Sequence, residues 1–172
     1  MNVKAEGSAN IVSVDVGVSG TPYAVGDVIG TAGGSGNDNG KLPFRAALKN
    51  SQRAGVLQSV TLYDYCNQKA AMDLLLFAQK PEGQYPDNAP IYGALAETNL
   101  GVLLGIVKIA QTDWKTVPGS VNNVAMAAPT FQPIVVRSND TSGTIYGVLI
   151  SGGTPTWYGS GMNLQLSLGF LL

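Results

Sequence analysis

One stretch of the sequence gathers residue types that could bind a phosphate or a metal ion. Five glycines fall within residues 30–40, and residues 37–40 offer consecutive amide and carboxylate oxygens. A phosphate loop needs G-x-G-x-x-G or G-x-x-x-x-G-K-[ST] before a helix, and neither spacing occurs. A calcium loop needs oxygen ligands at alternate positions and a later glutamate. We therefore predict a flexible loop ending in an Asn39-Gly40 turn. Residues 87–90 could also offer oxygens to calcium, but we favour an Asx turn there and predict no metal or cofactor site.

Side-chain catalysis has few candidate groups in this sequence. There is no histidine, which removes the usual general base and metal ligand, and Cys66 is the only cysteine. A catalytic cysteine usually needs such a base, so we interpret Cys66 as a small packed side chain. The eleven acidic residues are spread singly, and no G-x-S-x-G elbow occurs. We predict that the protein is not an enzyme; a hydrolase whose carboxylates pair only in space is the alternative.

Three aromatic residues stand beside polar groups in predicted loops and are candidate site residues. They are Trp114, Trp157 and Tyr158. Exposed aromatics of this kind form sugar-binding platforms or anchor protein interfaces, and they also pack in cores. Core packing is the interpretation we favour for any one of them, and interface contact comes next. We name the three as candidate interface residues.

The charge content points away from nucleic acid. Charged residues make up 12% of the chain, the net charge is −1, and the ten lysines and arginines form no cluster. Nucleic-acid binding relies on clustered cations at the phosphates. Hydrophobic residues make up 45%, so we expect other subunits to cover part of the surface.

Apolar runs are too short for a membrane span. The longest, residues 100–110, carries Lys108, and a spanning helix needs about 20 apolar residues. The start of the chain lacks the apolar segment of a secretory signal. We therefore expect a soluble protein made in a cytoplasm.

Alternation with period two dominates the sequence. Residues 12–18 place four valines on one face, which is typical of a half-buried strand. The 22 glycines and 9 prolines supply the turns between short strands. These features predict an all-β fold: a jelly-roll-like antiparallel β-sandwich with glycine-rich loops. Strands are predicted at 12–18, 23–31, 42–48, 55–63, 69–79, 102–110, 121–127, 134–138, 144–151 and 163–171, with one helical turn at 94–99.

The domain organisation follows from the same pattern. Residues 1–10 lack strand periodicity, so we predict an N-terminal arm that orders only on a neighbour. Residues 11–172 show no linker and no change of composition. They are predicted to form a single β-sandwich domain.

Several stretches together resemble a family of structural proteins of tailed bacteriophages and prophages. The resemblance runs through nearly the whole chain in the same order, and no single stretch is a catalytic signature. The stretches are TPYAVGDVIG (21–30), GVLQSV (55–60), LLLF (74–77), DNAP (87–90), YGVLI (146–150), GTPT (153–156) and LSLGFL (166–171).

The resemblance implies a virion structural protein of the head decoration or cement type. Such a protein binds over the assembled phage head and stabilises it. The expected partners are the major capsid protein and further copies of this chain, as a homotrimer. The expected location is the capsid surface, after synthesis in the bacterial host cytoplasm. The alternative is a carbohydrate- or receptor-binding module of a head or tail fibre.

Overall fold

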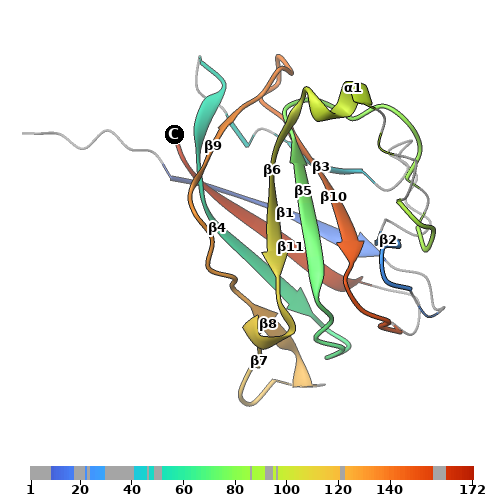
Figure 1. The fold of residues 1–172 in the computed structure, drawn as a ribbon. Helices are drawn as coiled ribbons and strands as arrows, with labels where there is room; N and C mark the ends of the chain where they lie inside the picture. The colour runs from blue at the N-terminus through green and yellow to red at the C-terminus, as the bar shows by residue number, and fades with distance from the viewer. Residues whose placement is uncertain are drawn as a thin grey trace, which may run out of the picture.

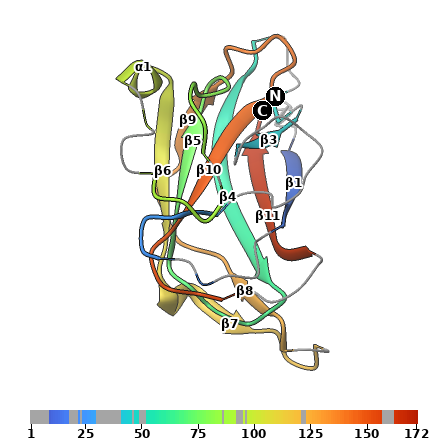
Figure 2. The ribbon, with the colours of Figure 1, turned by 90° about the vertical axis from the view of Figure 1, so that its right-hand side faces the viewer.

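The protein is described by a computed structural model in which nearly all regular structure is β-strand (Figure 1). Two antiparallel sheets pack face to face, and Figure 2 shows β6 on one side of the molecule and β1 on the other. The prediction of an all-β sandwich is confirmed. The structure describes residues 9–17, 22, 24–29, 41–45, 47–48, 52–85, 87–91, 95, 97–120, 123–156 and 162–172.

Within the described residues, the larger sheet has six strands. Its order is β1–β11–β4–β8–β7, and β9 pairs with β4 beside β8. The strands are β1 (Ala9–Gly17), β4 (Ala54–Asp64), β7 (Trp114–Thr116), β8 (Ala125–Ala127), β9 (Ile134–Arg137) and β11 (Met162–Leu171).

The smaller sheet has five strands in the part of the chain that the structure describes. Its order is β2–β10–β5–β6, and β3 pairs with β10 beside β2. The strands are β2 (Val28–Ile29), β3 (Leu42–Phe44), β5 (Met72–Phe77), β6 (Leu103–Ile109) and β10 (Ile145–Ser151). Two short helices precede and follow β6: α1 (Glu97–Leu100) and the 3-10 helix η1 (Gln111–Asp113).

The strand order is that of a jelly roll once two interrupted strands are counted as one each. Ile29 pairs with Leu149 and Leu42 with Gly147, so β2 and β3 are two halves of one strand along β10. In the same way, β8 and β9 lie end to end along β4. One sheet then reads β1, β11, β4, β8/β9 and the other β2/β3, β10, β5, β6. β7 pairs with β8 at the edge of the larger sheet and is an addition to this pattern. Apart from the connection from β7 to β8, all connections cross between the sheets except the one from β5 to β6, which is the pattern of two Greek keys.

The core lies between the sheets and follows from the alternation in the sequence. Leu164, Leu166, Leu168 and Phe170 of β11 point inward and are buried. Their alternating neighbours are only partly covered. Because side chains alternate along a strand, this period-two pattern fixes which face of each strand meets the core.

Several predicted boundaries need correction. The N-terminal arm was predicted to include residues 9 and 10, but both belong to β1, because Ala9 pairs with Leu171 and Asn10 with Phe170. The Asn10 amide also donates to the Ala47 carbonyl. Residues 1–8 of the predicted arm lie outside the described residues. β7 was not predicted, since Trp114–Thr116 shows no alternation.

A glycine marks an irregularity in β6, as its position in the predicted strand suggested. Leu76 pairs with Gly105 and Phe77 with Leu103, so the register shifts there. A side chain at Gly105 would lie against Ile134 of the facing sheet.

Among the described residues, no helix is long and apolar enough to cross a membrane.

Candidate functional site

Exposed apolar side chains cross the outer face of the larger sheet. Leu171 of β11 pairs with Val56 of β4, which pairs with Val135 of β9. Ile11 of β1 lies on the same face, opposite Gly169. Ile11 is 74% exposed, Val135 77% and Leu171 39%. We call these four residues the apolar band; it spans the sheet from β1 to β9, about 14 Å at the usual strand spacing.

The same face continues as small uncharged side chains. Ser13 pairs with Ser167, and their hydroxyl oxygens are 2.7 Å apart. Thr61 pairs with Ser167 from the other side. A Cβ at Gly169 would lie 2.3 Å from the Ser59 hydroxyl, so that serine covers the glycine backbone closely. Because these side chains are short, they project little from the sheet. This suits close contact with another protein surface.

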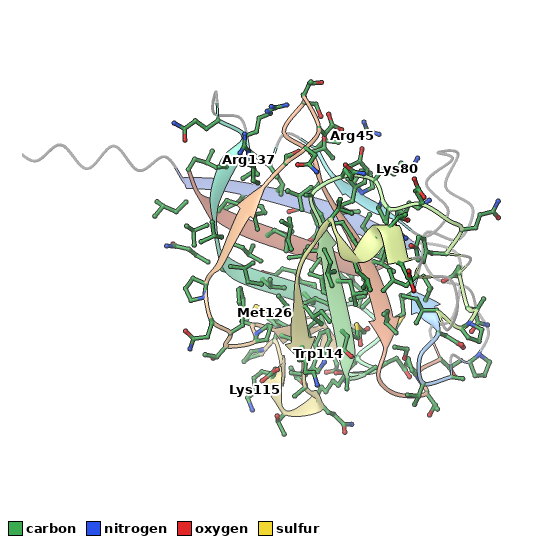
Figure 3. The ribbon with its side chains drawn as sticks, turned by 45° about the horizontal axis from the view of Figure 1, so that its top comes forward. Arg45, Lys80, Trp114, Lys115, Met126 and Arg137 are labelled. Carbon is green, nitrogen blue, oxygen red and sulfur yellow. The ribbon has the colours of Figure 1, made fainter. Side chains whose placement is uncertain are left out.

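Two arginines line a pocket at the end of the apolar band. The pocket has a volume of about 360 Å³ and is lined by Gln52, Arg53, Ala54 and Arg137. Ala54 pairs with Arg137, two positions along from the pair of Val56 and Val135. Figure 3 places Arg137 at the opposite end of the molecule from Trp114. The apolar band and two positively charged side chains are therefore adjacent on one surface.

The arginine pocket keeps its hydrogen-bond donors available. Among the described residues, no carboxylate forms an ion pair with Arg53 or Arg137, and neither guanidinium has a hydrogen-bond partner. Hydrogen bonds from Ser142 hold the pKa of Asp140 below its usual value, and the charge of Arg53 adds a smaller lowering. The charge of Arg53 thus acts on Asp140 without an ion pair between the two side chains.

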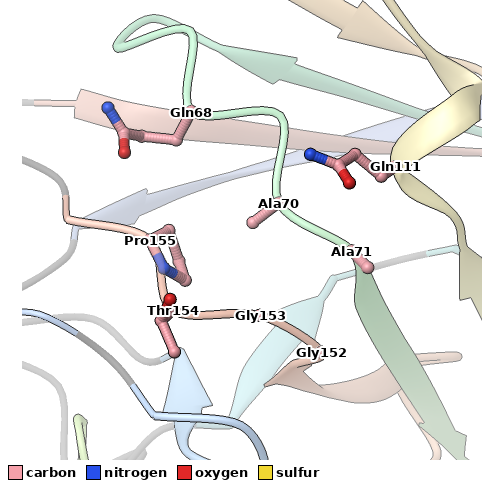
Figure 4. Close-up of a pocket in the computed structure, with 8 residues that line it drawn as sticks. All are labelled: Gln68, Ala70, Ala71, Gln111, Gly152, Gly153, Thr154 and Pro155. Atoms are coloured by element: carbon pink, nitrogen blue, oxygen red, sulfur yellow. The ribbon is translucent and has the colours of Figure 1, made fainter.

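A second pocket lies at the other end of the sandwich, where segments from both sheets meet (Figure 4). It has a volume of about 230 Å³. Figure 4 shows Gln68 and Gln111 along one side and Thr154 on the other. No charged side chain is among its described lining residues, which are Gln68, Ala70, Ala71, Gln111, Gly152, Gly153, Thr154 and Pro155.

Buried polar groups fix the walls of this second pocket. The carboxylate of Asp64, fully buried, accepts backbone N–H bonds from Cys66 and Lys69 at 2.9 Å each. The Trp114 indole N–H donates to the Ala70 carbonyl at 2.8 Å. The N–H of Gly152 donates to the Ala71 carbonyl at 2.8 Å and so joins the two walls. Fixed walls make a pocket better suited to a rigid ligand.

The predicted interface residues have mixed outcomes. Trp114 is 4% exposed and belongs to the core cluster. This burial supports the core-packing interpretation of Trp114 and corrects the prediction that it anchors an interface. Its ring packs in the core, and its N–H is hydrogen-bonded to Ala70 of the same chain. Trp157 and Tyr158 lie outside the described residues.

The other stretches singled out in the sequence have structural roles where they are described. Cys66 is partly buried. In the segment 87–90, Asn88 donates its backbone N–H to the Val28 carbonyl and the Ala89 carbonyl accepts from Val28, so the segment packs along β2. Residues 37–40 lie outside the described residues. Within the described part of the chain, no three potential metal-ligating residues cluster.

Sequence reasoning missed the apolar band and the arginine pocket. Arg53 and Arg137 are 84 residues apart in the printed sequence, and only the pairing of β4 with β9 brings them together. The chain matches no protein-family model, no curated protein and no solved structure.

Proposed function

We propose that this chain is a virion structural protein that binds over an assembled phage head and stabilises it. The observation that carries the proposal is the apolar band across the outer face of the larger sheet. The resemblance of the sequence to structural proteins of tailed phages agrees with it. The jelly-roll fold alone does not decide function, because lectins and cupins share it.

The physical argument concerns what covers the apolar band. Ile11 and Val135 expose about three quarters of their surface, and removing apolar surface from water stabilises a complex by about 25 cal/mol per Å². One such contact is weak, but a head presents many equivalent positions, and a symmetric oligomer engages several at once. We propose the major capsid protein as the partner and a homotrimer as the assembly. A cement role of this kind requires no catalytic group.

Phage heads lacking the protein test the proposal directly. Purified protein is added to such heads, bound protein is measured by co-sedimentation, and the temperature of genome release is recorded. We expect the protein to bind and to raise that temperature. Val135→Glu should weaken binding strongly, because it buries a charge at the contact.

The matched control is Ile106→Glu. Ile106 is also an exposed apolar residue, at 51%, but it lies on β6 of the opposite sheet. This variant should bind heads as the unmodified protein does. Heads that cannot assemble without the protein would make it a shell or scaffold component instead. Heads that are equally stable without it but adsorb poorly to cells would favour receptor binding.

A second candidate function is carbohydrate binding at the pocket of Figure 4. The observation in its favour is an uncharged lining with two amide side chains, Gln68 and Gln111, and the Thr154 hydroxyl. Amides and hydroxyls both donate and accept, as sugar hydroxyls require. A glycan array tests this function, with Gln111→Ala expected to abolish any binding and Gln132→Ala, on an exposed loop, expected to leave it unchanged.

A further inference from the structure

We propose that the pocket between Arg53 and Arg137 binds a side-chain carboxylate of the protein segment that covers the apolar band. This inference rests on the proposed docking function and names the chemistry of the partner. The partner segment would carry an aspartate or glutamate next to apolar side chains.

The first reason is the chemistry of the two side chains. Arg53 and Arg137 both line one pocket of about 360 Å³. A guanidinium presents paired N–H donors in a planar fork that matches the two oxygens of a carboxylate. Two such groups side by side repel each other, and an anion between them removes that repulsion.

The second reason is that nothing in the described part of the chain already satisfies these groups. Neither Arg53 nor Arg137 has an ion pair or side-chain hydrogen bond there. Asp140 senses the charge of Arg53, but its own oxygens accept from Ser142 and Tyr146. The pocket therefore has donor capacity for a group from outside.

The third reason is that the backbone beneath the arginines is held in place. Arg137 is the last residue of β9 and pairs with Ala54. Arg53 has a φ of 52°, in the left-handed region, and its carbonyl accepts the Ser138 N–H at 2.8 Å. A site on fixed backbone positions its donors with less entropy lost on binding.

The fourth reason favours a protein segment over a free anion. Val135 lies two residues before Arg137 on the same outward face of β9, and Val56 is opposite it. A free phosphate would occupy the pocket and leave these apolar side chains in water. A peptide with an acidic residue beside apolar ones would cover both parts, which is the arrangement of a polar group at the rim of an apolar contact.

The first test measures binding to phage heads that lack the protein, at 50 mM and 500 mM NaCl. The double variant Arg53→Gln/Arg137→Gln should bind about tenfold more weakly at low salt and lose most of the salt dependence. The control, Lys108→Gln, removes a positive charge from β6 of the opposite sheet. It should change neither affinity nor salt dependence. Unchanged binding by the double variant would overturn the inference.

The second test uses the isolated protein, so that it does not depend on heads. Arginine Nε–H signals are followed by NMR during titration with a blocked peptide of one aspartate between two leucines. The signals of Arg53 and Arg137 should shift with this peptide and stay in place with the asparagine analogue. No shift with either peptide would contradict the inference. Equal shifts with inorganic phosphate would make the pocket a free-anion site and overturn the assignment to a protein segment.

The two tests separate the inference from the function on which it rests. If the protein does not bind heads but the aspartate peptide shifts both arginine signals, the decoration function fails and the carboxylate site stands. If the protein binds heads and neither the double variant nor the peptide has an effect, the function stands and the carboxylate site fails.

Discussion

The indole N–H of Trp114 donates a 2.8 Å hydrogen bond to the backbone carbonyl of Ala70. Trp114 is the first residue of β7 in the larger sheet, and Ala70 lies just before Met72, where β5 of the smaller sheet begins. The bond therefore ties the two sheets together at one end of the sandwich. It also holds a wall of the uncharged pocket, since Ala70 lines it.

Trp114→Phe tests this bond while keeping an aromatic ring in the core. The buried Ala70 carbonyl loses its indole donor, so we expect the free energy of unfolding to fall by about 1–3 kcal/mol. Urea unfolding measures the loss, and sedimentation velocity checks the oligomeric state. A variant that unfolds like the unmodified protein but no longer oligomerises would restore Trp114 as an interface residue.

Gly143→Ala should be strongly destabilising. Gly143 has a φ of 71°, and an added Cβ would lie 2.1 Å from the Leu48 carbonyl oxygen, a backbone atom that cannot turn aside. Left-handed strain and overpacking together predict a loss of about 3 kcal/mol. Gly119→Ala is the matched control, because its φ is 73° but nothing lies within 4 Å. It should cost about 1 kcal/mol; equal losses in thermal unfolding would mean that the space at Gly143 is not restricted.

Asp140 makes stability depend on pH in the acid range. Hydrogen bonds from Ser142 lower its pKa below the ordinary 3.8, so the ionised form is favoured in the folded state. Its contribution is present above pH 3.8 and is lost as the pH falls through the lowered pKa. Asp140→Asn should therefore be slightly less stable than the unmodified protein at pH 6 and approach it at pH 2. Chemical unfolding across that range checks this, and a gap that stays constant would contradict it.

Metal removal should leave the fold intact. The described residues contain no cluster of potential ligands, and the oxygens at residues 37–40 are consecutive rather than alternate. We expect the unfolding temperature to be the same with and without EDTA. A fall in the unfolding temperature of more than about 5 °C with EDTA, reversed by calcium, would contradict this prediction. It would show that residues 37–40 bind the ion.

Strands whose alternation the core enforces could be predicted from sequence. The strands predicted at 55–63, 134–138 and 163–171 match β4, β9 and β11 closely. The predicted strand at 69–79 contains β5. Its four consecutive buried residues from Leu74 to Phe77 form a pattern that a buried helix segment could also produce, so periodicity alone does not identify this strand.

The strand predicted at 23–31 shows where local pattern fails. Among the described residues of this range, only Val28 and Ile29 form a strand, which pairs with β10, because the chain turns at Val25 and Gly26 before them. Gly26 has a φ of 90° and donates its N–H to the Ser151 carbonyl. The partner residue is 125 positions away in the printed sequence, so no local rule could have supplied it.

The candidate surface could not be predicted because it depends on register. Ile11, Leu171, Val56 and Val135 come from four strands. The first, second and fourth are each an ordinary exposed apolar residue, and Val56 is partly buried. Only the pairings of β1 with β11, β11 with β4 and β4 with β9 place them on one face. Trp114 was singled out for its residue type, and burial then decided its role.

The interruption between β2 and β3 makes this fold a natural site for displaying foreign peptides. Ile29 and Leu42 pair with Leu149 and Gly147, only two positions apart on β10. The sheet thus holds both ends of the intervening segment, whatever its length, and the entropy cost of closing a longer loop rises only slowly. An epitope spliced in at residues 33–36 would be carried at every copy of the protein without disturbing a strand pairing that the structure describes.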